Sequence, residues 1–202
     1  TSDVYTIEWQ ILGSGLNMAQ YHYCALPDDV LAWVGRISPE KGLEDAIAAA
    51  RIVQKPLKIF GKLEDMQYWQ RIQSEYAQAS LDSPVEYCGF LPTAQLQHAL
   101  GKCRALLVTP RWLEAFGMVV IEAMACGVPV IAYRSGGPAE IICSGKTGWL
   151  VEPGRVEEIV GAIAKLNQLD RAHCRQQAES HYSLHRWGKR FESWFYQVIS
   201  SS

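Results

Sequence analysis

Short apolar runs alternate along the chain with stretches in which apolar residues recur at helical spacing. The runs are four to six residues long, which is the length typical of buried strands. Glycine or polar residues follow most of them. We predict strands at Val30–Gly35, Leu57–Gly61, Val85–Cys88, Ala105–Thr109 and Val130–Tyr133, and a sixth, shorter piece at Gly148–Val151.

Helical spacing is clearest in four stretches between or after these runs. The first is an apolar stripe formed by Leu43, Ala46, Ile47, Ala50 and Val53. The second, Gly117–Cys126, has a well-marked end, because Gly127 occupies the position after the helix and Pro129 follows. Arg155–Leu169 and Leu184–Ile199 are predicted as two later helices.

The alternation of strands and helices predicts an α/β fold. Nearly continuous apolar strands are buried on both faces, as in a parallel sheet covered by helices on each side. We therefore expect a Rossmann-like, doubly wound domain over residues 30–180, with its ligand beyond the carboxyl ends of the strands. Residues 1–29 do not fit the alternation and are predicted to be an interdomain linker.

Composition limits the classes of partner. The 202 residues carry a formal net charge of −2, so no bulk positive field attracts nucleic acid, and any anion site must be local. Six cysteines form no Cys-x-x-Cys pair, which favours a reduced, cytoplasmic protein. No apolar run reaches the roughly 20 residues of a membrane span. The chain begins at Thr1, and we expect it to be a fragment of a longer protein.

The loop after the first strand, GRISPEKG at 35–42, is a candidate diphosphate site. Arg36 and Lys41 stand where a helix is about to begin, and a helix N-terminus favours anions. Arginine offers phosphate a planar fork, whereas lysine offers a mobile point charge. The alternative interpretation is two solvated surface cations near a turn.

The loop after Ala105–Thr109 leads into a second candidate site. Glu114 lies in this loop, and Glu122 lies about a turn and a half into the following helix, where a carboxylate can accept bonds from sugar hydroxyls. Gly117 allows close backbone approach, and the first amides of the helix are donors without intrahelical partners. Alternatively, Glu114 caps the helix and Glu122 faces solvent. The apolar neighbours of Glu122 argue against that alternative, because a carboxylate among them needs a partner.

These motifs together resemble a known family. GRISPEKG, EAFGMVVIE and EAMACGVPVIA are similar to the C-terminal domain of family 4 glycosyltransferases, which have the GT-B fold. The resemblance extends from about residue 30 to the end of the chain. The segment ILGSGLN, 11–17, resembles the family's linker, which usually reads NGID, although Ser14 and Asn17 depart from it.

The resemblance implies a role for each matching residue in binding a nucleotide-sugar donor, UDP- or GDP-linked. Arg36 and Lys41 would hold the diphosphate, and Glu114 would contact the hydroxyls of the transferred sugar. Glu122 would bind the ribose hydroxyls. The remaining matches are backbone or base contacts: the amides of Phe116 and Gly117 to the sugar, those of Met118 and Val119 to phosphate, and Gly89, Phe90 and Leu91 beside the base.

Other features of the sequence are weaker evidence of function. Gly13-Ser14-Gly15 begins a glycine-rich run, but Pro27 ends any helix too early for a dinucleotide fingerprint. His181 and His185 have the spacing of a metal pair, but no third ligand is near in sequence, which favours a structural role. No Asp-x-Asp occurs, so nothing suggests a metal-chelated diphosphate. We expect Trp112, Trp149, Trp187 and Trp194 to be packing residues.

The resemblance implies retaining, metal-independent transfer of a sugar to an acceptor hydroxyl by the full-length enzyme, with no separate cofactor. The 181–202 helix would pack toward a missing N-terminal, acceptor-binding domain. Any peripheral membrane association would belong to that missing domain. Two alternatives stay open: a nucleotide-sugar-binding module without transferase activity, and a GT-B epimerase. The sequence leaves the sugar, the base and the acceptor undefined.

Overall fold

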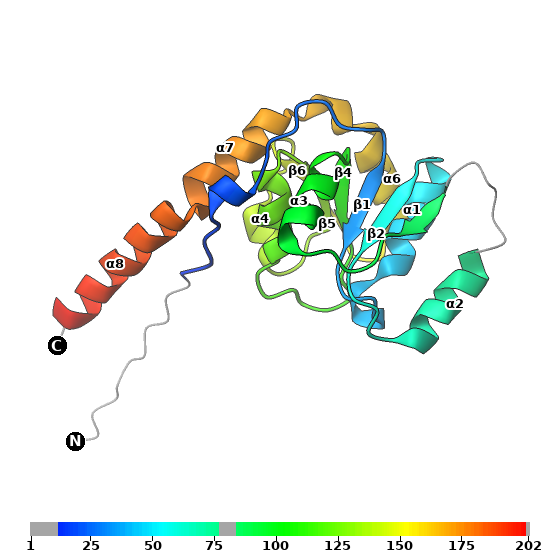
Figure 1. The fold of residues 1–202 in the computed structure, drawn as a ribbon, viewed down its shortest axis with the longest axis horizontal. Helices are drawn as coiled ribbons and strands as arrows, with labels where there is room; N and C mark the ends of the chain where they lie inside the picture. The colour runs from blue at the N-terminus through cyan, green and yellow to red at the C-terminus, as the bar shows by residue number, and fades with distance from the viewer. Residues whose placement is uncertain (1–11, 77–83, 201–202) are drawn as a thin grey trace, which may run out of the picture.

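The computed structural model describes residues 12–76 and 84–200. Within them, six parallel strands form one sheet in the order β3-β2-β1-β4-β5-β6 (Figure 1). The chain builds outward from β1 to β3, then returns to the other side of β1 to add β4, β5 and β6. This is the Rossmann strand order, with its switch point between β1 and β4. The strands are β1 Leu31–Val34, β2 Leu57–Phe60, β3 Val85–Tyr87, β4 Ala105–Val108, β5 Val130–Tyr133 and β6 Gly148–Val151.

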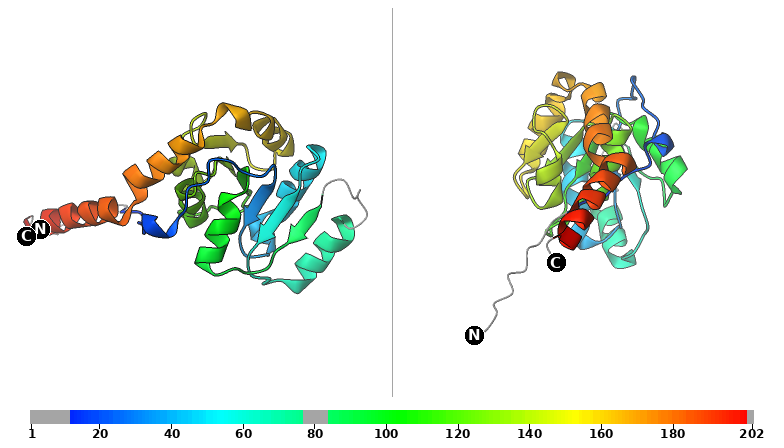
Figure 2. Two further views of the ribbon diagram at one scale, coloured as in Figure 1. Left: turned by 45° about the horizontal axis from the view of Figure 1, so that its top comes forward. Right: turned by 90° about the vertical axis from the view of Figure 1, so that its left-hand side faces the viewer.

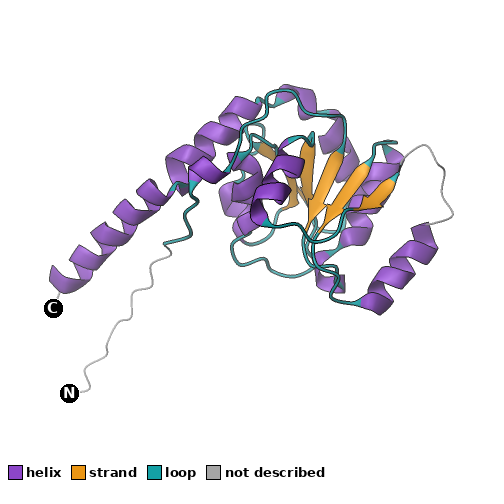
Figure 3. Ribbon diagram, in the orientation of Figure 1, coloured by secondary structure: helices purple, strands orange, loops and turns teal. Residues whose placement is uncertain are grey.

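Helices cover both faces of the sheet (Figure 3). The core on one face includes residues of α3 (Thr93–Gly101), α4 (Met118–Ala125), α5 (Gly137–Ile141) and α7 (Arg171–Tyr182). The core on the other face includes residues of α1 (Leu43–Ile52), α2 (Met66–Tyr76) and α6 (Val156–Ala164). The last helix is α8, Leu184–Ser200, and the short 3₁₀ turns are η1 Met18–Gln20, η2 Pro39–Lys41 and η3 Leu166–Gln168.

Side chains of the central strands alternate between the two cores. In β5, Val130 and Ala132 belong to the core with α4, whereas Ile131 and Tyr133 belong to the core with α6. All four are fully buried, which requires an apolar residue at every position rather than at every second one. The predicted Rossmann-like fold and its six strands are confirmed.

The structure differs from the predicted helices in detail. The stretch predicted as one helix over 155–169 is α6 followed by the separate turn η3, because the α-helix ends at Ala164. The end of α4 is as predicted: Gly127 is left-handed, and the Val128 amide donates to the Ala123 carbonyl at 2.9 Å, closing the helix. The sequence patterns did not assign α7, since it buries only Cys174 and Ala178 along twelve residues.

Residues 12–24 run beside α7 and the start of α8, and residues 25–29 then lead across to β1 (Figure 1). The Leu16 amide donates to the Tyr182 carbonyl at 2.6 Å, and the Leu184 amide donates to the Leu16 carbonyl at 2.9 Å. Beyond that point α8 extends away from the sheet, as Figure 1 and the left view of Figure 2 show, and it buries none of its residues. The two ends of the described chain therefore lie side by side.

Two arginines of α7 attach residues 18–24 to the body of the domain. Arg175 Nη1 donates to the carbonyls of Tyr21 and Ala125, each at 2.6 Å. Arg171 donates to the carbonyls of Cys24 and Gly101, each at 2.7 Å, and to that of Cys103 at 3.0 Å. Ala125 and Gly101 end α4 and α3, so these cations satisfy carbonyls at the negative ends of two helices.

Candidate donor-binding site

The loops that follow β1 and β4 meet at the carboxyl edge of the sheet. Gly42 is left-handed, with φ 63°, and a Cβ there would lie 2.0 Å from the Thr109 carbonyl oxygen. The Thr109 hydroxyl donates to the Gly42 carbonyl at 2.7 Å, and the Arg111 amide donates to the Glu40 carbonyl at 2.8 Å. A side chain at position 42 would separate the loops, so glycine is required for this contact.

Lys41 and Glu114, one from each loop, form an ion pair. Lys41 Nζ lies 2.6 Å from Glu114 Oε2, and both side chains are about four-fifths buried. Trp112 completes the group, because its Nε1–H donates to the same oxygen at 3.3 Å and its ring centroid lies 4.5 Å from Lys41 Nζ. The structure thus joins two residues that are 73 positions apart in the sequence.

Arg36 lies on the same loop as Lys41 but has different partners. Its guanidinium contacts Glu64 at 2.7 Å and Glu40 at 3.3 Å, and about half of the side chain is exposed. A hydrogen bond from the Ser38 hydroxyl, together with the nearby cations Arg36 and Lys41, lowers the pKa of Glu40. Both candidate cations are therefore balanced by carboxylates in this structure, and an anionic ligand would compete with those carboxylates for them.

The α4 helix begins beside Glu114, directly after its N-cap residue Gly117, whose φ is 83°. The start of α5, which follows β5, contacts the loop before α4. The Gly137 amide donates to the Glu114 carbonyl at 2.8 Å. A Cβ on Gly136 would lie 2.1 Å from the Glu114 carbonyl oxygen, and one on Gly137 would lie 2.0 Å from that of Phe116. The first amides of α4, from Met118 and Val119, have no acceptor within their own helix and can donate to an anion.

Glu122 lies one turn further along α4 and is mostly buried. The Tyr21 hydroxyl donates to Glu122 Oε1 at 3.3 Å. Burial raises the pKa of Glu122, and the bond from Tyr21 only partly offsets that effect. Glu122 therefore has the partner that its apolar surroundings require, and the alternative of a solvent-facing residue is wrong.

Gly89, Phe90 and Leu91 follow β3 and lie beside the ends of β1 and β2. Gly61 has φ 146°, its amide donates to the Gly89 carbonyl at 2.9 Å, and a Cβ there would lie 1.8 Å from the Gly35 carbonyl oxygen. A small, mostly apolar niche of about 190 Å³ opens at this point. Its lining includes Val34, Gly35, Arg36, Phe60, Gly61, Lys62, Phe90, Leu91 and Leu96.

The fold, the two linked loops and the helix start can be compared with known proteins. The model of the family described as "Glycosyl transferases group 1" matches residues 25–181. The chain belongs to this family. An uncharacterized glycosyltransferase of Methanocaldococcus jannaschii is 33% identical over 134 residues, which are 66% of this chain and 37% of that protein.

A second curated relative and two solved structures match a larger part of the chain. A GDP-mannose-dependent alpha-(1-6)-phosphatidylinositol monomannoside mannosyltransferase of Mycolicibacterium smegmatis is 32% identical over 170 residues, covering 78% of this chain and 44% of that protein. Sucrose-phosphate synthase from Thermosynechococcus elongatus has a TM-score of 0.80 at 25% identity, over 96% of this chain and 53% of that one. Anabaena Alr3699/HepE in complex with UDP-glucose has a TM-score of 0.79 at 21% identity, over 93% and 56%.

The chain thus spans less than half of the length of those two curated relatives and a little over half of the length of the two solved chains. The solved structures, as GT-B enzymes, agree with the fold expected from the resemblance. No helix in the described ranges has the length and apolar character to cross a membrane. Across 12–76 and 84–200, no three His, Cys, Asp or Glu side chains gather as a metal site would require.

Some residues of this site were not predicted from the sequence. Trp112 was predicted to be a packing residue, which is wrong: it is 43% exposed and contacts Lys41 and Glu114. Its place two residues before Glu114 was the available signal. Tyr21 lies 101 positions from Glu122, so no spacing could have indicated their contact. The Gly136-Gly137 pair after β5 was visible as a turn, although its contact with the Glu114 loop was not.

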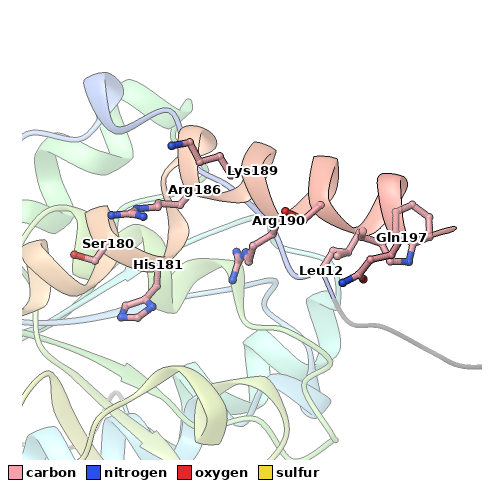
Figure 4. Close-up of a pocket in the computed structure, with 9 residues that line it drawn as sticks. Leu12, Ser180, His181, Arg186, Lys189, Arg190 and Gln197 are labelled. Atoms are coloured by element: carbon pink, nitrogen blue, oxygen red, sulfur yellow. The ribbon is translucent and has the colours of Figure 1, made fainter. Parts of the chain in front are cut away.

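A larger groove, of about 600 Å³, lies away from this site, between α7, α8 and the N-terminal segment (Figure 4). None of the predicted site residues lines it. Three of its side chains, Arg186, Lys189 and Arg190, are cations from the first half of α8. The full lining is Leu12, Ser180, His181, Arg186, Lys189, Arg190, Ser193, Trp194 and Gln197.

Proposed function

We propose that this chain is the donor-binding domain of a retaining, metal-independent glycosyltransferase that moves a sugar from a nucleoside diphosphate to an acceptor hydroxyl. The single observation that supports this best is the meeting of Lys41, Glu114 and the α4 start at the switch point of the sheet. Ligands of doubly wound folds bind at such points. A cation, a carboxylate and a helix N-terminus within one loop pair suit a ligand that carries both phosphate and hydroxyl groups.

The chemistry that these residues would assist is departure of the diphosphate. The bond between the anomeric carbon and the diphosphate oxygen breaks and the diphosphate leaves with the electron pair, a bond from the acceptor oxygen to that carbon forms, and the acceptor proton passes to the departing diphosphate. Negative charge grows on the leaving oxygen. Lys41, Arg36 and the α4 amides would stabilise that charge where it develops, which lowers the barrier. No bound metal is needed for this part of the stabilisation.

Each remaining site residue has a place in this proposal. Glu114 would accept bonds from the transferred sugar, and Glu122 would accept bonds from the ribose. The niche beside Gly89, Phe90 and Leu91 would hold the base. We infer a UDP- or GDP-linked donor, since one relative is named for GDP-mannose and one structural neighbour was solved with UDP-glucose.

We further propose that the acceptor binds to a preceding domain that this chain does not include. The Phe116 ring, in the Glu114 loop, lies against Tyr182 at the end of α7, and a Cβ on Gly13 would lie 3.2 Å from that ring. The N-terminal segment therefore passes directly beside the Glu114 loop. This is the position expected of a linker that leads from a preceding domain to this one. The cationic groove and the exposed face of α8 would lie toward that domain.

The test is calorimetric titration of this chain with UDP, GDP, UDP-glucose and GDP-mannose. Glu122→Ala should weaken nucleoside diphosphates and their sugar-linked forms alike, because it removes a ribose contact. Glu114→Ala should not weaken the free diphosphate, because it removes a carboxylate that competes for Lys41, and it should weaken the sugar-linked form relative to the free diphosphate by about 1.5–3 kcal/mol, the range for a hydrogen bond to a charged group. Equal losses of free diphosphate affinity in both variants would contradict the division of roles.

The same titrations, repeated with a chelator, test metal independence. Affinity should be unchanged when divalent ions are removed, because the proposed charge partners are side chains and amides. A large loss on chelation would contradict this part of the proposal. Sugar transfer by a longer protein that includes the preceding domain would distinguish a transferase from a binding module, and conversion of the donor without an acceptor would favour an epimerase.

A further inference from the structure

Trp112 is placed to control the orientation of the Glu114 carboxylate. Glu114 Oε2 accepts two hydrogen bonds, from Lys41 Nζ at 2.6 Å and from Trp112 Nε1 at 3.3 Å. No hydrogen bond to Oε1 occurs among the residues that the structure describes. One oxygen of the carboxylate is therefore held by protein donors, while the other retains its capacity to accept bonds from a ligand.

The indole also acts on the cation of the pair. The Lys41 ammonium lies 4.5 Å from the centroid of the Trp112 ring, within the range of a cation–π contact. Trp112 is 43% exposed at the loop surface, so burial in the core does not explain its presence. Its two contacts join the residue proposed to bind sugar to the residue proposed to bind diphosphate.

We propose that Trp112 is a positioning residue that sets the preference of this site for sugar-linked over free nucleotide. The inference rests on the proposed function, because it assumes that Glu114 Oε1 receives the sugar hydroxyls. Without the indole N–H, the carboxylate is held by Lys41 alone and can rotate about its terminal bond, which is a soft torsion. When a diphosphate draws Lys41 toward itself, the indole is the remaining donor that keeps Glu114 in place.

Two substitutions separate the functions of the indole. Trp112→Phe keeps an aromatic ring beside Lys41 but removes the N–H donor, whereas Trp112→Leu removes both. Trp149→Phe is the matched control, because Trp149 lies on β6 beside Lys165. For each variant, affinities for UDP and UDP-glucose, and for GDP and GDP-mannose, are measured on one protein sample. The ratio of the two affinities is then independent of the fraction of protein that is folded.

For Trp112→Phe, we expect the preference for sugar-linked nucleotide to fall about two- to tenfold, as for loss of one hydrogen bond, with free diphosphate affinity nearly unchanged. Trp112→Leu should lower the same ratio and also weaken the free diphosphate about two- to fivefold, as for loss of an exposed cation–π contact. Trp149→Phe should change neither quantity. An unchanged ratio in Trp112→Phe, with wild-type binding intact, would overturn this inference alone. Absence of nucleotide binding by the wild type would overturn the proposed function together with it.

Discussion

Glu122 lowers the stability of the folded domain near neutral pH, a cost that the proposed ligand contact would explain. Its carboxylate lies in the apolar helix α4, with the Tyr21 hydroxyl as its hydrogen-bond donor at 3.3 Å. Burial raises its pKa, which means that the folded protein favours the neutral form more than the unfolded chain does. The ionised form near neutral pH is therefore a cost to folding, and its retention needs a reason such as ribose binding.

Glu122→Gln should reveal this cost through its dependence on pH. A raised folded-state pKa gives a stabilisation that is present below the ordinary pKa of about 4.5 and is lost as pH rises through the folded value. The variant and the wild type should thus melt together near pH 4, and the variant should melt higher near pH 7. Thermal denaturation across this range measures the difference.

Glu192→Gln is the control, because Glu192 is exposed on α8 and its replacement should not produce the same trend. A wild type that gains stability over the variant as pH rises would show that Glu122 is stabilised in its charged form. Nucleotide titration of the same Glu122 variant should show weakened binding, which connects the stability cost to the ligand.

At the scale of elements, the β4–α4 loop has its shape because a neighbouring loop fits beneath it. Gly136 and Gly137 approach the carbonyls of Glu114 and Phe116 so closely that no side chain fits between them. The conformation of residues 114–117 therefore depends on a turn that follows the next strand of the sheet.

Gly137→Ala should displace residues 114–117. The added Cβ would lie 2.0 Å from the Phe116 carbonyl oxygen, and backbone must move to relieve that contact. We expect a loss of stability of about 1–3 kcal/mol, as in overpacked sites, together with weaker donor binding. Gly161→Ala in α6 is the control: nothing lies within 4 Å of its Cβ, so it should stabilise by about 0.5–1 kcal/mol through helix propensity. Equal melting temperatures for the two variants would refute the steric argument.

Elements were predictable from the sequence to the extent that burial dictates their pattern. The central strands β4 and β5 are fully buried apolar runs, and α4 has both an apolar face and a glycine stop. Helix α7 is half solvent-exposed, and hydrogen bonds from its arginines to backbone carbonyls hold it in position. Such hydrogen bonds cannot be recognised from the spacing of hydrophobic residues. Likewise, the loops after β1 and β4 could be located from the sequence. The contacts of Trp112 with Lys41 and of Tyr21 with Glu122 could not, because each joins segments that are far apart in the sequence.

At the scale of the whole molecule, α7 joins the two ends of the described chain. Arg175 is about four-fifths buried and donates to carbonyls of the N-terminal segment and of α4. Removal of its charge would leave these carbonyls without their donor in a partly buried place, and such groups are costly to leave unpaired.

Arg175→Met keeps most of the side-chain stem and removes the donors. We expect a loss of about 1.5–3 kcal/mol, since the bonds involve a charged group, and hence a melting temperature lower by about 3–12 °C for a domain of this size. Arg186→Met, an exposed arginine of α8, should change the melting temperature by about 1 °C or less. Hydrogen exchange should speed up at Leu16 and Cys24 in the Arg175 variant. Unchanged protection there would mean that this segment is held by other contacts.

The arginine pair of α7 also has a consequence for biosynthesis. Residues 18–24 are made long before Arg171 and Arg175, which follow them by 147 to 157 positions. While the ribosome is completing the sheet, this early segment lacks the side chains that will fix it in place. Its docking must therefore be among the last steps of folding, and it can occur only after α7 has left the exit tunnel. Any preceding domain would be connected to this one only through an undocked segment until then. It could therefore fold first and pack against this domain after the sheet and α7 are complete.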